Sequence, residues 1–169
     1  MDFKTFQCLA RCNGAHVRAV HAPETCTKEF VDTIREEIKT LTARRDGKEY
    51  FVATYSRAVL NQTGDGHYSP IGGYNADDDM VLVFDVARFK YPPHWVKLQL
   101  LAEAMCTKDS ESGATRGYAT LSKSEKVSVL DLSGKGRVLI PTIPPAAISD
   151  LAEKLQKTLE GSRKKIQNR

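Results

Sequence analysis

The stretch GDGHYSPIGGYNADDDMVLVFDVA, residues 64–87, decides how the middle of this chain folds. Segments 67–75 and 80–87 are rich in β-branched and aromatic residues, and a polar, acidic segment separates them. This pattern is typical of a β-hairpin, and the second segment is apolar enough to be a central strand. His67 would open the first strand and Asp85 would lie within the second, so their side chains can be cross-strand neighbours.

A histidine and an aspartate placed in this way have two interpretations. A carboxylate within hydrogen-bond reach fixes the imidazole tautomer and stabilises its charged form, which is the base-and-orienter half of a catalytic triad. Gly64 and Gly66 suit such a site, since glycine lets the backbone approach a substrate closely. A buried aspartate needs a partner in any case, however, and the pattern alone favours a structural pair. The spacing by itself leaves both interpretations open.

The other elements follow from similar patterns. Alternation or β-branched content predicts strands at 3–10, 16–22, 49–56, 67–75, 80–87 and 116–122, with strands or extended segments at 127–134 and 137–141. Asn13-Gly14 would be the turn between the first two strands. Apolar residues three or four positions apart predict helices over 27–45, from Trp95 through Met105, and from Ile148 to Gly161. The order lacks βαβ regularity, which predicts an α+β fold with a mostly antiparallel sheet and flanking helices.

Composition and charge limit the classes of partner. The chain has 169 residues, 41% hydrophobic and 27% charged, as expected for one globular domain or a large part of one. Its net charge of +4 comes largely from the terminal GSRKKIQNR. The sequence lacks a basic stripe with interleaved aromatic residues, so we expect no nucleic-acid partner. The sequence contains neither a membrane-length apolar run nor a secretory signal pattern. We therefore expect a cytoplasmic protein without a membrane partner, with its cysteines reduced.

Residues 64–95, GDGHYSPIGGYNADDDMVLVFDVARFKYPPHW, closely resemble the most characteristic segment of the phytochelatin synthases, the glutathione γ-glutamylcysteinyltransferases. The similarity includes CLARCNGAHV upstream and LLAEAM and DSESGATRGYATLS downstream, so it covers roughly residues 7–122. The resemblance implies a partial papain-like domain, with residues 1–122 as the C-terminal part of a catalytic domain. Residues 123–169 would be an extension with possible strands and a terminal amphipathic helix.

The resemblance also implies a reaction. In this family a Cys-His-Asp triad cleaves glutathione before its glycine, and the γ-glutamylcysteinyl group stays on sulfur as a thioester. A second glutathione or a growing phytochelatin then accepts that group, for heavy-metal detoxification. By this resemblance His67 is the general base and acid, and Asp85 orients it. Asp109 and Arg116 would hold the α-amino and α-carboxylate groups of the γ-glutamyl moiety, since charges of opposite sign fit a zwitterion.

Further substrate contacts are predicted around the same hairpin. Arg57, Arg88 and Lys90 would supply positive charge for the carboxylates of a second glutathione, and Gly66 would give the substrate room. A surface role for the three basic residues fits the pattern equally well, because alternation within DVARFK does not settle which of them face the site.

The nucleophile does not match the family pattern. A papain-like nucleophile precedes the histidine, at the start of an early helix beside an aromatic residue and a glycine. Cys8 and Cys12 lie in a predicted strand and turn, and Cys106 follows His67. We therefore expect an incomplete catalytic domain, inactive alone, whose uncovered apolar face favours self-association. The alternative is a non-catalytic glutathione or metal-thiolate binding module, or a regulatory pseudoenzyme. Another papain-like peptidase fits less well, since peptidases need no clamp for a γ-glutamyl group.

Metals are predicted to act through the substrate. The resemblance implies no organic cofactor, and it implies activation by ions such as cadmium and zinc, mainly as metal-glutathione thiolates. Cys8 and Cys12, with His16 and His21 nearby, lack the paired spacing of a structural zinc site. No metal site is predicted in the chain itself.

Overall fold

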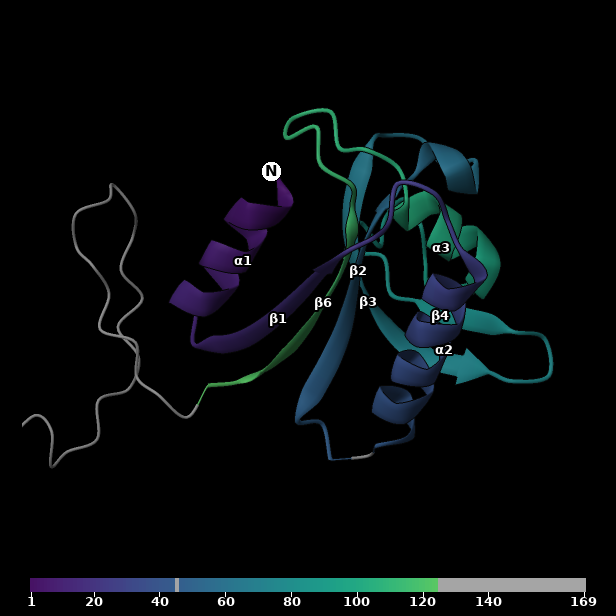
Figure 1. Ribbon diagram of the computed structural model, residues 1–169. Coiled ribbons are helices and arrows are strands. Elements are labelled where there is room, and N and C mark those ends of the chain that lie inside the picture. Colours follow the sequence, from purple (N-terminus) through teal and green to yellow (C-terminus); the bar gives the residue numbers. More distant parts are fainter. Residues whose placement is uncertain (45, 125–169) are drawn as a thin grey trace, which may run out of the picture. The chain divides into compact units, whose positions relative to one another are not determined.

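A single antiparallel sheet organises the residues that the structure describes, 1–44 and 46–124 of this computed structural model (Figure 1). Its strand order is β1-β6-β2-β3-β4-β5, and each neighbouring pair runs antiparallel. The strands are β1 (Ala15–His21), β2 (Glu49–Ser56), β3 (Gly66–Asn75), β4 (Met80–Val83), β5 (His94–Lys97) and β6 (Gly117–Lys123). The helices are α1 (Phe3–Cys12), α2 (Lys28–Ala43) and α3 (Leu98–Met105), with a 3-10 turn η1 (Ala58–Leu60). The predicted α+β class is confirmed.

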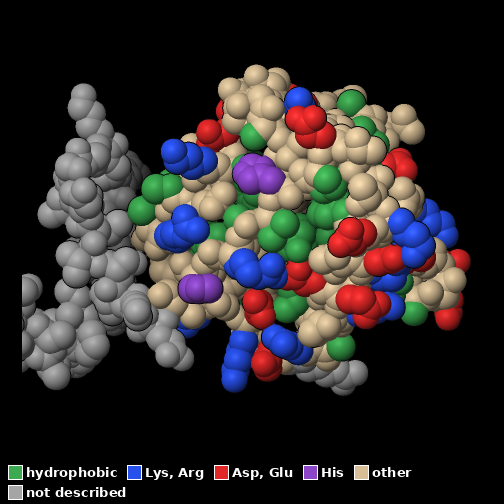
Figure 2. All heavy atoms as spheres, in the orientation of Figure 1, with side chains coloured by type: hydrophobic (Ala, Val, Ile, Leu, Met, Phe, Trp, Pro, Cys, Tyr) green, Lys and Arg blue, Asp and Glu red, His purple; other side chains and the backbone are tan. Residues whose placement is uncertain are grey.

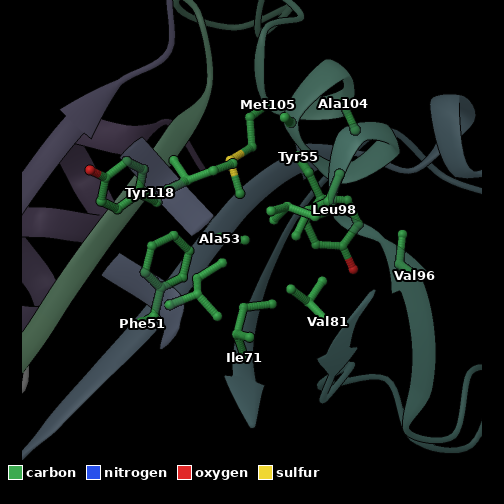
Figure 3. Close-up of a cluster of buried hydrophobic side chains, with 14 of the residues drawn as sticks. Phe51, Ala53, Tyr55, Ile71, Val81, Val96, Leu98, Ala104, Met105 and Tyr118 are labelled. Atoms are coloured by element: carbon green, nitrogen blue, oxygen red, sulfur yellow. The ribbon is translucent and has the colours of Figure 1, made fainter. Parts of the chain in front are cut away.

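Helices cover both faces of the sheet. Side chains alternate along β2, so Phe51, Ala53 and Tyr55 all face the core under α2 and α3. Figure 3 shows this cluster, in which Phe51 stacks on Tyr118 of β6 with ring centroids 4.6 Å apart. Helix α1 lies on the opposite side of the sheet from α2 (Figure 1). The core between the sheet, α2 and α3 therefore fixes the position of the end of β2 and the start of β3, where the candidate site lies.

The strand predicted at 3–10 is wrong, because these residues form α1. Asp2 caps the helix by accepting a hydrogen bond from the Thr5 N–H at 2.7 Å. Phe3, Phe6 and Ala10 share one face and pack with Val17 of β1 and other residues of the sheet. Their spacing of three and four fits a helical face, and burial of that face against the sheet outweighs the local alternation.

The predicted hairpin is present, but Asp85 does not lie within its second strand. β4 pairs with β3 only as far as Val83 opposite Ile71, and the ladder is irregular around Gly72. The ring of Phe84 fills the space above Gly72, where an added Cβ would lie 2.2 Å from it. Asp85 therefore occupies the loop that follows β4, where its direction is set by tertiary contacts and not by strand alternation.

The remaining predictions agree with the structure, apart from one element. Strands at 16–22, 49–56 and 116–122 and the helix over 27–45 are present with small shifts at their ends. Trp95 belongs to β5 and pairs with Leu82, so the second helix begins only at Leu98. The segments predicted at 127–134, at 137–141 and from Ile148 to Gly161 lie outside the described residues.

Apolar side chains also remain exposed on the sheet. Tyr50 and Trp95 alternate with the buried Phe51 and Val96, so they point to the face that carries α1, and both are about half exposed. On the side of the molecule drawn in Figure 2, acidic and basic side chains are interspersed around exposed hydrophobic ones. Among residues 1–44 and 46–124, no helix has the length and apolar character that crossing a membrane requires.

Gly117 is the first residue of β6, directly after Arg116, and its backbone has no room for a side chain. Its φ is +155°, and an added Cβ would lie 2.1 Å from the Val20 carbonyl oxygen of β1. We expect Gly117→Ala to lower the free energy of unfolding in urea by about 3 kcal/mol or more, because backbone cannot yield as a side chain can. Gly113→Ala is the control, since φ is +68° there but the space is open, and about 1 kcal/mol is expected. Equal losses would contradict this account.

Candidate active site

The carboxylate of Asp85 is the buried centre of the candidate site. Its side chain is 0% exposed, yet three groups of the chain donate hydrogen bonds to it. Nη2 of Arg57 lies 2.6 Å from Oδ1, the Ala87 N–H lies 2.7 Å from Oδ1, and Nε2 of His67 lies 3.1 Å from Oδ1. A buried charge needs such partners, because transfer from water without them costs several kcal/mol. The sequence expectation that His67 and Asp85 meet is confirmed.

The contact with Asp85 fixes how the His67 ring can act. A carboxylate paired with arginine only accepts hydrogen bonds, so Nε2 of the imidazole must carry the proton. In the neutral ring the lone pair then lies on Nδ1. The His67 side chain is 22% exposed, whereas Asp85 is fully enclosed. The site therefore contains a partly exposed imidazole whose orientation is fixed by the buried Asp85 carboxylate.

The surroundings of His67 favour its neutral form. Burial lowers the pKa of His67 below its usual 6.5, and the positive charge of Arg57 lowers that pKa further, while Asp85 opposes both effects. Tyr55 packs its ring edge against the imidazole, with centroids 6.3 Å apart, and its hydroxyl hydrogen-bonds Ser69. Burial raises the pKa of Tyr55, so it adds no charge near the imidazole. His67 can therefore accept a proton at neutral pH.

A second charged cluster forms around Arg116, whose side chain is 3% exposed. Nη1 donates to Thr107 Oγ1 at 2.8 Å and to the Lys108 carbonyl, and Nη2 donates to Asp65 Oδ1 at 2.9 Å. Asp109 Oδ2 is 3.7 Å from Nη2, so the predicted pair is brought together in a looser contact. The Nε of Arg116 is buried without a partner among the described residues.

Asp109 stays ionised within its loop. Burial would raise the pKa of Asp109, but the N–H groups of Ser112 and Glu111 and the Ser112 hydroxyl hold it below its usual value. Its side chain is 18% exposed, unlike that of Arg116. The two residues predicted to hold a zwitterion are therefore oppositely charged neighbours, with only Asp109 partly open to solvent.

The tripeptide Asp65-Gly66-His67 connects the two clusters. The Asp65 carbonyl accepts the Arg57 N–H at 3.2 Å, and its carboxylate accepts from Arg116 and from Ser110 Oγ at 2.8 Å. An added Cβ at Gly66 would lie 3.0 Å from Nε of Arg116. Because Gly66 has no side chain, Nε of Arg116 can lie close to the backbone there, next to His67 in the sequence.

A cleft of about 480 Å³ adjoins the buried carboxylate. Its lining consists of Pro70, Phe84, Asp85, Val86, Arg88 and Pro93. Arg88 and Lys90 are exposed, so both predicted cations are accessible to a ligand, whereas Arg57 is 5% exposed. A second hollow of about 360 Å³, lined by α2, Arg18 and Glu49, contains none of the predicted site residues. Among the described residues no three His, Cys, Asp or Glu side chains form a group that could hold a metal ion.

Comparisons with known proteins identify the family of this chain. The sequence model of the family described as phytochelatin synthase matches residues 1–118. The chain belongs to the phytochelatin synthase family. It is 47% identical over 126 residues to glutathione gamma-glutamylcysteinyltransferase 3 of Lotus japonicus, covering 75% of this chain and 25% of that protein. The glutathione gamma-glutamylcysteinyltransferase of Schizosaccharomyces pombe is 41% identical over 122 residues, covering 72% of this chain and 28% of that protein. This chain therefore spans about a quarter of the length of these relatives.

None of the cysteines of this phytochelatin synthase chain hydrogen-bonds His67 within the described residues. Cys8 and Cys12 are exposed on α1, and Cys26 and Cys106 lie together at the edge of the core. Burial and contact with Cys26 raise the pKa of Cys106 to about 12, and partial desolvation with contact from Cys8 raises that of Cys12. Because the thiolate is the nucleophile, these shifts leave both thiols poorly reactive at neutral pH.

Two contacts of the candidate site were missed by sequence reasoning. Arg57 was assigned to the substrate, although its guanidinium binds Asp85, and Asp65 was not assigned at all. A signal for the first existed, since an aspartate after an apolar strand calls for a cationic partner as well as a histidine. Asp65 carried no such signal, because its partner Arg116 is distant in sequence and in an unrelated element.

The lowered pKa of His67 predicts how pH changes the stability of this phytochelatin synthase chain. The unfolded chain takes up a proton near pH 6.5, before the folded chain does. The stability from neutral His67 is therefore present above pH 6.5 and lost as the pH falls through the lower folded-state pKa. Between about pH 7.5 and about pH 5, we expect the free energy of unfolding in urea to fall more steeply for the parent chain than for His67→Gln. Parallel pH profiles would exclude this coupling.

Proposed function

We propose that this chain supplies the acid–base half of a γ-glutamylcysteinyl transfer from glutathione to a second glutathione or a phytochelatin. The observation that carries the proposal is the 3.1 Å contact of His67 Nε2 with the buried Asp85, which leaves Nδ1 as a lone-pair base in a partly exposed position. Membership of the phytochelatin synthase family and the names of the relatives support the same reaction.

In the proposed reaction, Nδ1 of His67 takes the proton of a cysteine thiol, and the thiolate attacks the carbonyl carbon between the cysteine and glycine of glutathione. The imidazolium then gives its proton to the leaving amine of glycine, and a thioester remains on the sulfur. The amine of a second glutathione attacks that thioester, and His67 accepts the amine proton and returns one to the sulfur. Asp85 keeps the ring in the tautomer that these transfers need.

The Arg116 cluster is proposed to hold the γ-glutamyl group. Arg116 has a buried Nε that lacks a partner among the described residues and lies close to Gly66, and a substrate carboxylate would satisfy that N–H. Asp109, partly exposed and ionised, would face the α-amino group. Arg88 and Lys90 are exposed near the cleft and suit the carboxylates of the acceptor, including glutathione bound as a cadmium or zinc thiolate.

The nucleophile is proposed to come from outside the described residues, because the thiols within them lie away from His67 or have raised pKa values. A papain-like arrangement, with residues 1–122 as the C-terminal part of the catalytic domain, would place a cysteine-bearing segment next to His67. Without that segment, the exposed apolar side chains of the described residues would favour self-association in solution.

A direct test follows from the position of the cysteines. We expect the purified chain, given glutathione and cadmium ion, to release no glycine above the uncatalysed background, because loss of a triad nucleophile typically costs about a million-fold in turnover. Glycine is measured by derivatisation and chromatography, with Cys8→Ser/Cys12→Ser as the control chain. Robust release that disappears in the control would overturn the proposed source of the nucleophile and identify α1 as its carrier.

The absence of a cysteine bonded to His67 also favours a second candidate function, a glutathione-binding module without catalysis. The two functions share the Arg116 cluster and differ in the need for the base. Two results together would favour the binding module. The chain would bind glutathione, and it would release no glycine even when combined with a cysteine-bearing segment of the family.

Gly66→Ala tests the glutathione site itself. The new methyl group would lie 3.0 Å from Nε and Nη2 of Arg116, whose guanidinium is held by three partners and cannot move aside freely. We expect the affinity for glutathione, measured by calorimetry, to fall about tenfold or more, or about 1.4 kcal/mol. Gly73→Ala is the matched control on β3, where the nearest atoms lie at an ordinary 3.7 Å. Equal affinity in both variants would place glutathione elsewhere.

A further inference from the structure

We propose that Arg57 is a positioning residue, which holds the Asp85 carboxylate and through it sets the tautomer and basicity of His67. This inference rests on the proposed function of His67 as the base. It replaces the expectation that Arg57 binds the carboxylate of a second glutathione.

The contacts of Arg57 are with the chain itself. Its Nη2 lies 2.6 Å from Oδ1 of Asp85 and also contacts Oδ2, and the two side chains are 6% and 0% exposed. The guanidinium carbon lies 4.9 Å from the centroid of the Tyr91 ring, and the Arg57 N–H is bonded to the Asp65 carbonyl. The ion pair and the aromatic ring therefore hold the side chain, and the bond from the Arg57 N–H to Asp65 holds its backbone.

These contacts engage Nη2 of Arg57, and its Nε is buried without a partner among the described residues, in a side chain that is only 6% exposed. A second carboxylate at Nη2 would have to displace Asp85, and the displaced carboxylate would then be a buried, unpaired charge. Arg88 and Lys90 form no ion pair with the described residues, both are exposed, and Arg88 lines the cleft. The acceptor carboxylates have those two cations available without any such cost.

The position of Arg57 has a consequence for proton transfer. Because Arg57 already balances the charge of Asp85, the carboxylate does not need a protonated His67 as its counter-ion. The groups that face the imidazole are Asp85 beyond β4, Arg57 beyond β2 and Tyr55 on β2, while Asp65 and Arg116 pair with each other on the far side of Gly66. Among them, Arg57 is the group whose positive charge lowers the pKa of His67, in addition to the larger effect of burial.

The experiment is an NMR titration of His67 in the chain as it is, using ring ¹⁵N and ¹H signals assigned by comparison with His67→Gln. In Arg57→Met we expect about a tenfold larger ratio of imidazolium to imidazole for His67 at a given pH, because one facing cation is gone and Asp85 remains. Arg35→Met is the matched control, since Arg35 is likewise ion-paired with an aspartate, Asp79, but away from the site. Its His67 titration should match that of the parent chain.

Arg57→Lys keeps the proposal testable should Arg57→Met not fold. Lysine restores the charge without the planar fork, so we expect the His67 titration to stay near that of the parent while the Nε2–H tautomer becomes less dominant. The affinity for glutathione should stay within about twofold of the parent in both variants, because the substrate is held elsewhere. An unchanged His67 titration together with a tenfold loss of glutathione affinity would overturn the proposal and return Arg57 to the substrate.

These readouts separate the inference from the proposed function. Neither titration nor glutathione affinity requires turnover, so a changed His67 titration would support the role of Arg57 even if no acyl transfer were found. Conversely, the proposed function would stand and this inference would fall if acyl transfer were observed while the His67 titration was the same in Arg57→Met as in the parent chain.

Discussion

A single buried carboxylate is the constraint on which the rest of this site depends. Asp85 is fully enclosed, and a negative charge in that position is tolerable only while Arg57, His67 and the Ala87 N–H all donate to it. Each partner comes from a different part of the sheet or its loops. The ends of β2, β3 and β4 are thereby held together, and the imidazole is fixed as one consequence of satisfying the charge.

The same logic extends to the neighbouring cluster. Arg116 is even more buried than Arg57, and its partners include Asp65, two residues before His67. The start of β3 is therefore held by one arginine on each side, with Gly66 between them leaving space for Nε. Two buried guanidinium groups with unpartnered Nε atoms show that this region is built around charge and not around apolar packing.

Much of the scaffold was predictable from local patterns. The α2 helix, the β3–β4 hairpin and β6 each carry a strong period or a β-branched run that agrees with their tertiary environment. The first ten residues were misread because their apolar spacing fits both periods, and only contact with Val17 and its sheet neighbours favours the helix. Asp85 was misplaced for a related reason, since the apolar run continues past Val83, the last residue of β4 that pairs with β3.

By itself, the sequence determined which chemical groups are present near the hairpin, namely one imidazole, one carboxylate and several arginines, and it indicated the family through their order. Only the tertiary structure decided how these groups are shared. In it, Arg57 pairs with Asp85 and Arg116 pairs with Asp65, and no cysteine of the described residues hydrogen-bonds His67. The physical reason is that spacing along a strand sets the face of a side chain, whereas the partner of a buried charge is chosen by whichever groups the folded chain brings within hydrogen-bond distance.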